Sequence, residues 1–218
     1  MVHVAFAPPG ICEVIELLRP GDILTHCYTG VSMRICDDNQ TIYRDVRRAF
    51  ERGVLRDVGH GAGSFSFESA EIALEAGFPP DLISTDLHTM SLRGPESVEV
   101  NDGSPIIDLQ SGVSRTFDLP VCLSKFLAIG MSIGDVIRAA TASPANVLGL
   151  GHEIGFIEIG YAADIVVFEL EAGPHEYHDM YGNHRVGSER IAPRATFRAG
   201  ELWQAGESEP GNGLVSAA

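Results

Sequence analysis

Short apolar runs alternate with segments of helical spacing over residues 1–87 of the chain. The runs are rich in valine, isoleucine and leucine, which is typical of buried strands. The segments between them repeat apolar residues every three or four positions, which indicates helices. Alternating strands and helices favour parallel βαβ units. The pattern predicts strands at 1–6, 22–27, 54–61 and 81–87 and helices at 11–21, 43–53 and 66–78.

The remainder of the chain follows a different pattern. Residues 87–119 form a long segment rich in Gly, Ser and Asp, and a segment of this length after a strand is typical of a lid or a binding loop. The tail at 206–218 is expected to be disordered. Between them, the pattern predicts helices at 119–130 and 132–141, a short helix capped by serine at 143–149, and two strands at 163–170 and 195–203 joined by a loop.

Polar side chains occur near one end of the predicted parallel strands. His26, His60 and Asp86 each stand at or next to the end of a strand, and His3 lies within the first strand. Turn sequences such as "RPGD" and "GFPPD" precede the strands instead, so they connect helices to strands at the opposite face. The carboxyl ends of parallel strands carry the chemistry in barrels and open α/β sheets, so these four residues are candidates for one site.

Composition excludes several classes of protein. The formal net charge of −15 argues against nucleic acid or an anionic membrane as a partner. The 218 residues contain no apolar run of about 20 that would span a membrane, and the N-terminus lacks the basic region of a signal peptide. The four cysteines form no C-x-x-C pair, and reduced thiols in a cytoplasmic protein are expected.

Taken together, three imidazoles and one carboxylate at one face predict a metal site. Histidine and carboxylate are ligands that a borderline divalent ion such as zinc prefers. Such an ion would supply hydroxide at neutral pH, and Asp86 could accept a proton from the bound water and pass it to a leaving group.

Each residue also has a simpler interpretation. A histidine at a strand end is more often a hydrogen-bonded structural residue, Asp86 could cap the next element, and Cys27 is more often a small apolar thiol than a ligand. The tract "HEYHDMYGNH" looks like a metal-binding sequence but is far from the strand ends. Its histidines, together with one upstream, are expected to be solvated in loops: His152, His175, His178 and His184.

Several motifs in order resemble the amidohydrolase superfamily over nearly the whole chain. The resemblance is to its amidohydrolase/deacetylase metallohydrolase branch, near dihydroorotases and adenine deaminases. It implies an α/β fold: the C-terminal half of a (β/α)8 TIM-like barrel, strands 5–8, over residues 1–153, then part of a β-sandwich at 154–205 and the tail. The motifs are "MVHVAF", "RPGDILTHCYTG", "RDVGHGAGSFSF", "ISTDLHTMS", "DLPVCLSKFLAIGMS", "ATASPANVLGLG" and "IGYAADIVVFEL".

The resemblance also implies roles for individual residues. His3 and His26 match the histidines of the fifth and sixth strands that bind a binuclear metal centre, and Asp86 matches the aspartate of the eighth strand. His60 and His88 are then expected to hold the substrate or its oxyanion. The implied activity is hydrolysis of a C–N amide, or a related acyl ester, of a small molecule by a metal-bound hydroxide with Asp86 as proton shuttle.

One departure from the family pattern matters. The chain has neither the H-x-H pair of the first strand nor the lysine of the fourth, because its motifs begin at the fifth strand. We therefore expect either a truncated sequence or a chain completed by a partner, such as an N-terminal half or a second copy, and favour truncation. Two alternatives remain open: a catalytically inactive fragment or scaffold, and a mononuclear site using only His3, His26 and Asp86.

Overall fold

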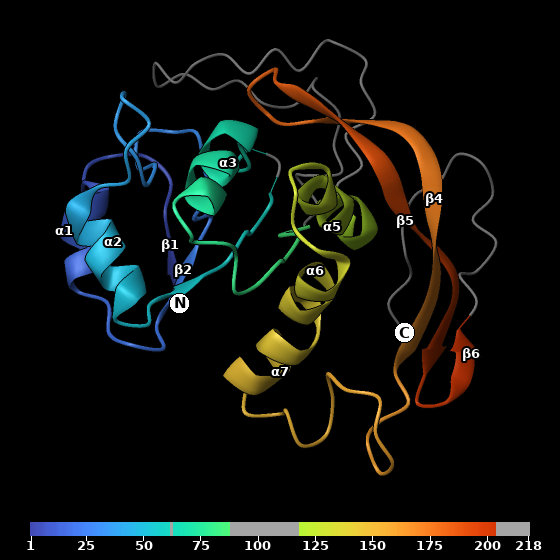
Figure 1. Cartoon of the computed structure of the whole chain (residues 1–218). Coiled ribbons are helices and arrows are strands. Elements are labelled where there is room, and N and C mark those ends of the chain that lie inside the picture. Colours follow the sequence, from blue (N-terminus) through green and yellow to red (C-terminus); the bar gives the residue numbers. More distant parts are fainter. Residues whose placement is uncertain (62, 88–117, 204–218) are drawn as a thin grey trace.

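A three-stranded parallel sheet forms the centre of the N-terminal part. The computed structural model describes residues 1–61, 63–87 and 118–203 (Figure 1). The strands β1 (Val2–His3), β2 (Ile23–Thr25) and β3 (Leu55–Arg56) lie side by side in that order. Three of the four predicted strands and their parallel arrangement are thus confirmed, although each is shorter than expected.

The fourth predicted strand is only partly formed. Residues 81–86 run along β3 and are joined to it by one bridge, between Asp57 and Leu82. The backbone amides of His60 and Gly61 donate to the carbonyls of Ser84 and Thr85 at 3.0 and 2.9 Å. The segment therefore places Asp86 beside the end of β3 without being a regular strand.

Three helices connect these strands as predicted: α1 (Ile11–Glu16), α2 (Arg44–Glu51) and α3 (Phe67–Glu75). The Ser66 hydroxyl accepts a hydrogen bond from the Ser69 amide and caps α3. The buried side chains of α2 are Val46, Ala49 and Phe50, at the spacing of one helix face.

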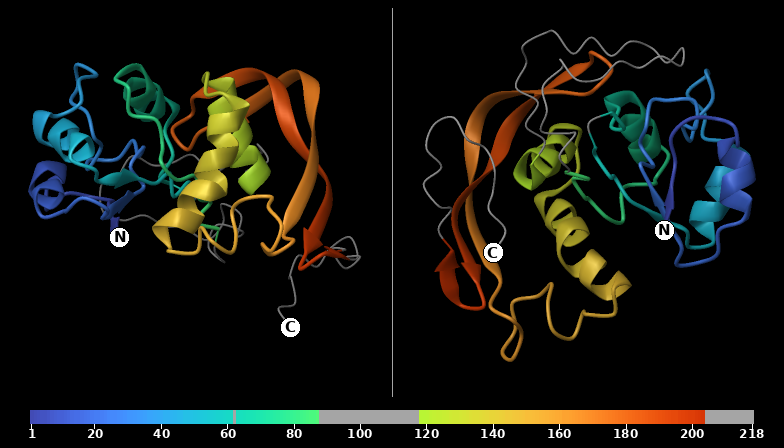
Figure 2. Two further views of the ribbon diagram at one scale, coloured as in Figure 1. Left: turned by 60° about the horizontal axis from the view of Figure 1, so that its bottom comes forward. Right: turned by 180° about the vertical axis from the view of Figure 1, so that it is seen from behind.

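Three further helices lie between the parallel sheet and the C-terminal sheet (Figures 1 and 2). They are α5 (Leu119–Ala128), α6 (Ile133–Ala140) and α7 (Ala142–Val147). The predicted Ser143 cap of the third helix is wrong: α7 begins at Ala142 after Thr141, two positions before the expected cap, so Ser143 lies inside the helix. Among the described residues, no helix has the length and apolarity that crossing a membrane requires.

The C-terminal sheet is antiparallel and dominated by one long hairpin. Its strands are β4 (Ile165–His178), β5 (His184–Arg198) and β6 (Glu201–Trp203), paired in that order. The prediction of a loop between residues 170 and 195 was wrong. Glu171 pairs across the strands with Arg190 at 2.5 Å, and a register shift between Ala172 and His175 accommodates the Gly-Pro pair. Charge and Gly-Pro obscured the strand pattern in the sequence.

The hairpin is joined to the N-terminal part through α5 and through its tip. The Ile191 amide donates to the Ser124 hydroxyl on α5 at 3.0 Å. At the tip, the buried Asp179 accepts from the amide of Phe67 at 3.0 Å, and Tyr181 donates to the carbonyl of Gly63 at 2.8 Å. The hairpin therefore contacts the loop that follows β3, next to the candidate site.

Candidate active site

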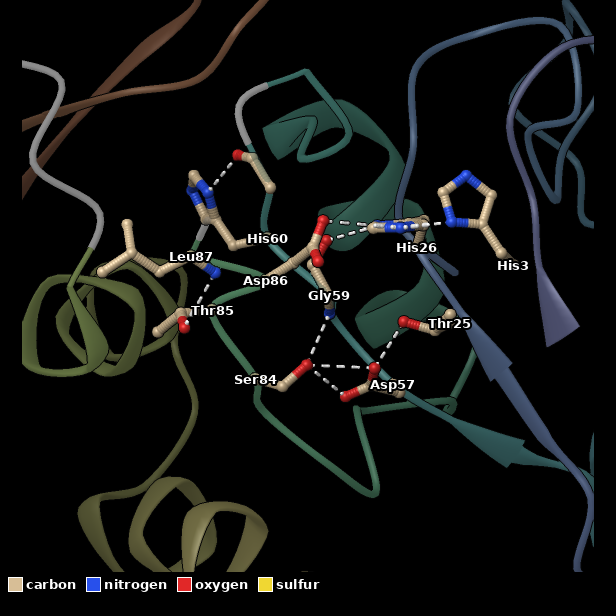
Figure 3. A network of polar contacts seen from close by, with 11 residues as sticks. His3, Thr25, His26, Asp57, Gly59, His60, Ser84, Thr85, Asp86 and Leu87 are labelled. Atoms are coloured by element: carbon tan, nitrogen blue, oxygen red, sulfur yellow. Dashed lines mark hydrogen bonds and ion pairs between the residues drawn. The ribbon is translucent and has the colours of Figure 1, made fainter. Parts of the chain in front are cut away.

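His3 and His26 face each other at the ends of β1 and β2 (Figure 3). His3 is in register with Thr25, the last residue of β2, so His26, which follows it, reaches the same edge of the sheet. The Nδ1 atom of His3 lies 3.0 Å from Nε2 of His26, and the rings meet edge to face. The expectation that His3 points toward His26 is confirmed.

The carbonyl of Gly59 fixes the proton on His26. Nδ1 of His26 lies 2.5 Å from this oxygen, which can only accept, so Nδ1 carries the proton and Nε2 presents its lone pair to His3. Gly59 has φ +46°, and a Cβ atom there would meet Thr25 Oγ1 and His26 Nδ1. Only glycine lets the backbone approach the imidazole this closely.

Asp86 completes the group that faces His26. Its Oδ2 atom lies 3.8 Å from Nε2 of His26, and the aspartate side chain is 44% exposed whereas that of His26 is 4% exposed. Both residues have positive φ, +48° and +58°. Burial lowers the pKa of His3, the nearby His26 lowers it further, and Asp86 opposes both effects. The group thus combines two imidazoles with a carboxylate that solvent can reach.

His60 lies on the other side of Asp86 and is fully buried (Figure 3). Its Nδ1 lies 2.9 Å from the Gly61 carbonyl and its Nε2 lies 2.8 Å from Nζ of Lys125. Burial and then Lys125 hold the pKa of His60 well below its usual range, and burial lowers the pKa of Lys125 to about 8. Because both ring nitrogens are hydrogen-bonded within the protein, contact with a substrate would require one of these bonds to open. That role stays a prediction.

The other candidate residues lie elsewhere. His88 falls outside the described residues. Cys27 is buried, and burial raises the pKa of its thiol well above the usual range, which disfavours the thiolate that a metal needs. The histidines of the "HEYHDMYGNH" tract belong to the ends of β4 and β5 and not to a loop as expected: His175, His178 and His184.

Comparison with known proteins identifies the family. A profile of the amidohydrolase family matches residues 67–202. The chain belongs to this family. It is 31% identical over 204 residues to a deacetylase of Enterococcus faecalis, covering 93% of this chain and 50% of that protein. It is 34% identical over 183 residues to a deacetylase of Agrobacterium fabrum, covering 84% of this chain and 40% of that protein.

Solved structures of amidohydrolase relatives show the same fold. The chain matches a crystal structure of an adenine deaminase with a TM-score of 0.79 and 32% identity, over 94% of this chain and 50% of that one. It matches a dihydroorotase with a TM-score of 0.73 and 34% identity, over 93% and 50%. The chain thus spans about half the length of the relatives it matches. The α/β class is confirmed, while the assignment to barrel strands 5–8 stays a prediction.

Amidohydrolases generally use divalent metals, and the candidate site fits part of such a ligand set. Two ligands bound at about 2.0–2.1 Å to one tetrahedral ion are separated by roughly 3.3 Å. His3 Nδ1 and His26 Nε2, at 3.0 Å, lie slightly closer together than that. Oδ2 of Asp86, at 3.8 Å from His26, stands slightly farther away. Within residues 1–61, 63–87 and 118–203, no group of three or more such side chains is arranged to hold an ion by itself.

Two polar residues near the site escaped the sequence analysis. Asp57 is buried in β3's extension and hydrogen-bonds Thr25 and Ser84, and Lys125 is buried against His60. A signal for each was present. Asp57 interrupts the apolar run "VLRDV", and Lys125 is the only lysine in the sequence and stands among apolar residues of a helix. Charged residues are rarely buried without a specific partner.

Proposed function

We propose that the complete protein to which this chain contributes is a metal-dependent amidohydrolase that cleaves a C–N amide, or a related acyl ester, of a small molecule. The relatives named deacetylase support an acyl substrate. His3, His26 and Asp86 would contribute to the metal site, with zinc as the expected ion. Since the chain spans half of its relatives, we propose that the remaining ligands come from the other half of the barrel.

A divalent ion bound there would supply a water of lowered pKa and polarise the scissile carbonyl. The chain's own residues would perform the remaining steps. His26 would offer Nε2 as a ligand because Gly59 holds the proton on Nδ1. Oδ2 of Asp86 would accept the proton of the attacking water and deliver it to the leaving nitrogen. With its side chain 44% exposed, Asp86 is accessible to water.

The observation that carries this proposal is the convergence of Nδ1 of His3, Nε2 of His26 and Oδ2 of Asp86 at one edge of the parallel sheet. Polar side chains with a purely structural role would be expected to be shielded from solvent, with their hydrogen bonds made to other protein groups. Asp86 instead is 44% exposed, and its Oδ2 lies 3.8 Å from Nε2 of His26, the same nitrogen that faces His3.

Metal analysis combined with activity assays tests the proposal. The complete protein should contain zinc or a similar ion, hydrolyse at least one member of a panel of N-acetyl amino acids and cyclic amides, and lose activity on dialysis against a chelator. Activity that survives chelation with no bound metal would overturn the metal-dependent mechanism. Retained metal without hydrolysis of any amide or ester would overturn the assigned reaction.

A catalytically inactive subunit or scaffold of the same fold is the second candidate. It is favoured by the finding that the described residues alone form no set of three metal-holding side chains. The two candidates differ in one measurement: the scaffold would carry no metal in the complete protein, even after incubation with excess zinc.

A further inference from the structure

A buried carboxylate lies directly beneath the candidate site. Asp57 is 3% exposed and extends the line of β3 between β2 and the segment 81–86. Its Oδ2 accepts a hydrogen bond from the Thr25 hydroxyl at 2.5 Å. The Ser84 hydroxyl lies 2.8 Å from Oδ1 and 3.0 Å from Oδ2. One side chain thus joins three neighbouring backbone segments just below His26 (Figure 3).

Burying this carboxylate is costly, which points to a role beyond filling space. Among the ion pairs of the described residues, none involves Asp57, so hydroxyl groups and not a cation stabilise its charge. Burial raises the pKa of Asp57, while the hydrogen bonds from Thr25 and Ser84 and the nearby His26 oppose that rise. A buried acid satisfied by neutral donors contributes less to stability than an apolar residue of similar volume would.

A continuous chain of hydrogen bonds connects Asp57 to His26. The Ser84 hydroxyl, oriented by Asp57, accepts from the Gly59 amide at 3.1 Å. The carbonyl of the same Gly59 accepts from Nδ1 of His26 at 2.5 Å. The amide and the carbonyl of Gly59, which has a positive φ, are therefore both hydrogen-bonded, the amide to Ser84 and the carbonyl to His26.

We propose that Asp57 is a positioning residue for His26, acting through Ser84 and Gly59 to keep the His26 proton on Nδ1 and the Nε2 lone pair available to a divalent cation. The proposal rests on the proposed metal-binding function of His26. A negative charge on Asp57 beneath the ring would also favour a cation bound above it, because opposite charges attract.

Asp81 provides a matched control on the same pair of segments. It also joins β3 to the segment 81–86, but at the opposite end, where its carboxylate forms two side-chain bonds with Arg56 at 2.8 and 2.7 Å. Changing Asp81 to asparagine should lower the stability of this pair of segments without altering the hydrogen bonds of Gly59. Asp57→Asn and Asp81→Asn thus separate positioning of His26 from support of the fold.

The test uses the complete protein with ¹⁵N-labelled histidine. In the metal-free wild type, the His26 ring should show Nδ1 protonated, its signals being assigned by their absence in His26→Gln. Asp57→Asn should produce a mixture of the two tautomers and weaken zinc binding by about 10–100-fold, the range for outer partners of metal ligands. Asp81→Asn should keep the wild-type tautomer and affinity while lowering the melting temperature.

Ser84→Ala gives a second route if Asp57→Asn does not fold, because it removes only the hydroxyl that links Asp57 to Gly59 and should shift the tautomer likewise. A wild-type tautomer and zinc affinity in both Asp57→Asn and Ser84→Ala would overturn the proposal, as would an equal loss of affinity in Asp81→Asn. A wild type that binds no zinc would instead refute the proposed function, and the tautomer measurement would still decide whether Asp57 positions His26.

Discussion

Lys125 connects His60 to the C-terminal sheet: its Nζ atom lies 2.8 Å from Nε2 of His60 and 2.6 Å from the carbonyl oxygen of His178. The amine also lies over the rings of Phe65 and Phe67, at 5.3 and 5.9 Å from their centroids. The only lysine of the chain is therefore buried where the loop after β3, α5 and β4 meet.

This placement predicts a pH dependence of stability. The pKa of Lys125 is about 8 in the folded protein against 10.5 ordinarily. Below pH 8 the amine is protonated in both states, and the full cost of burying its charge is present. Between pH 8 and 10.5 the unfolded state binds more protons, so stability rises with pH. The free energy of unfolding of the wild type, relative to Lys125→Met, should increase by on the order of 1–3 kcal/mol over this interval.

The measurement is denaturant unfolding of both proteins at several pH values. Buried thiols and phenols, such as Cys122, whose pKa burial raises to about 12, change the free energy of unfolding with pH in the opposite direction. Their contribution cancels when the free energy of the variant is subtracted from that of the wild type. A difference that stays constant from pH 8 to 10.5 would show that Lys125 keeps an ordinary pKa.

Replacing Asp86 with asparagine should remove most of the activity. The amide nearly preserves the shape of the carboxylate but cannot accept the proton of the attacking water. General acid–base catalysis contributes on the order of 10²–10⁴, so kcat should fall by at least that factor. Asp38→Asn is the control, since that side chain is 96% exposed. Turnover of Asp86→Asn within a few-fold of the wild type would exclude Asp86 as the shuttle.

Replacing His26 with glutamine should weaken metal binding. The variant loses the nitrogen that Gly59 directs toward His3, so zinc affinity should decrease by at least about 10–100-fold, the range seen when outer partners alone are lost. His152→Gln serves as control, because its side chain is 73% exposed and forms an ion pair with the adjacent Glu153. Equal zinc content in the two variants, measured by competition with a chelator, would argue that His26 is not a ligand.

Replacing Tyr181 with phenylalanine should loosen the hairpin tip. The hydroxyl donates to the Gly63 carbonyl at 2.8 Å and accepts from the Gly30 amide at 3.2 Å, so its loss leaves two partly buried backbone groups without this partner. The expected loss is about 1–3 kcal/mol in the free energy of unfolding. Tyr177→Phe, which removes a hydroxyl 3.4 Å from the Glu189 carbonyl, should cost less. A larger loss of free energy in Tyr177→Phe than in Tyr181→Phe would indicate that the tip contributes little to stability.

The sequence predicted which strand ends form the site better than it predicted the hydrogen bonds between residues far apart in the chain. Apolar runs and strand-end polarity sufficed to bring His3 and His26 together, because parallel strands in register align their ends. They could not reveal that Gly59 approaches His26, since that contact depends on a positive φ and joins residues 33 positions apart in the sequence. Nor could they reveal the partner of His60, which comes from a helix 65 residues later.

The hairpin shows a second limit of sequence patterns. Ile165–Leu170 is predicted as a strand because apolar residues dominate. The next part of β4 contains charged residues that pair with β5, such as Glu171 with Arg194, at 2.7 Å. Such pairs appear only once the two strands are aligned, so neither strand shows a strong pattern alone.

The docking of Tyr181 onto Gly30 and Gly63 bears on how the molecule folds. The predicted domain boundary lies between residues 153 and 154, yet hydrogen bonds at the tip of the C-terminal hairpin satisfy backbone groups in loops of the N-terminal part. Neither part can be removed without leaving such groups unpaired in the other. The two parts should therefore unfold as one cooperative unit. An insertion near residue 153 should be tolerated better than producing the two parts as separate polypeptides.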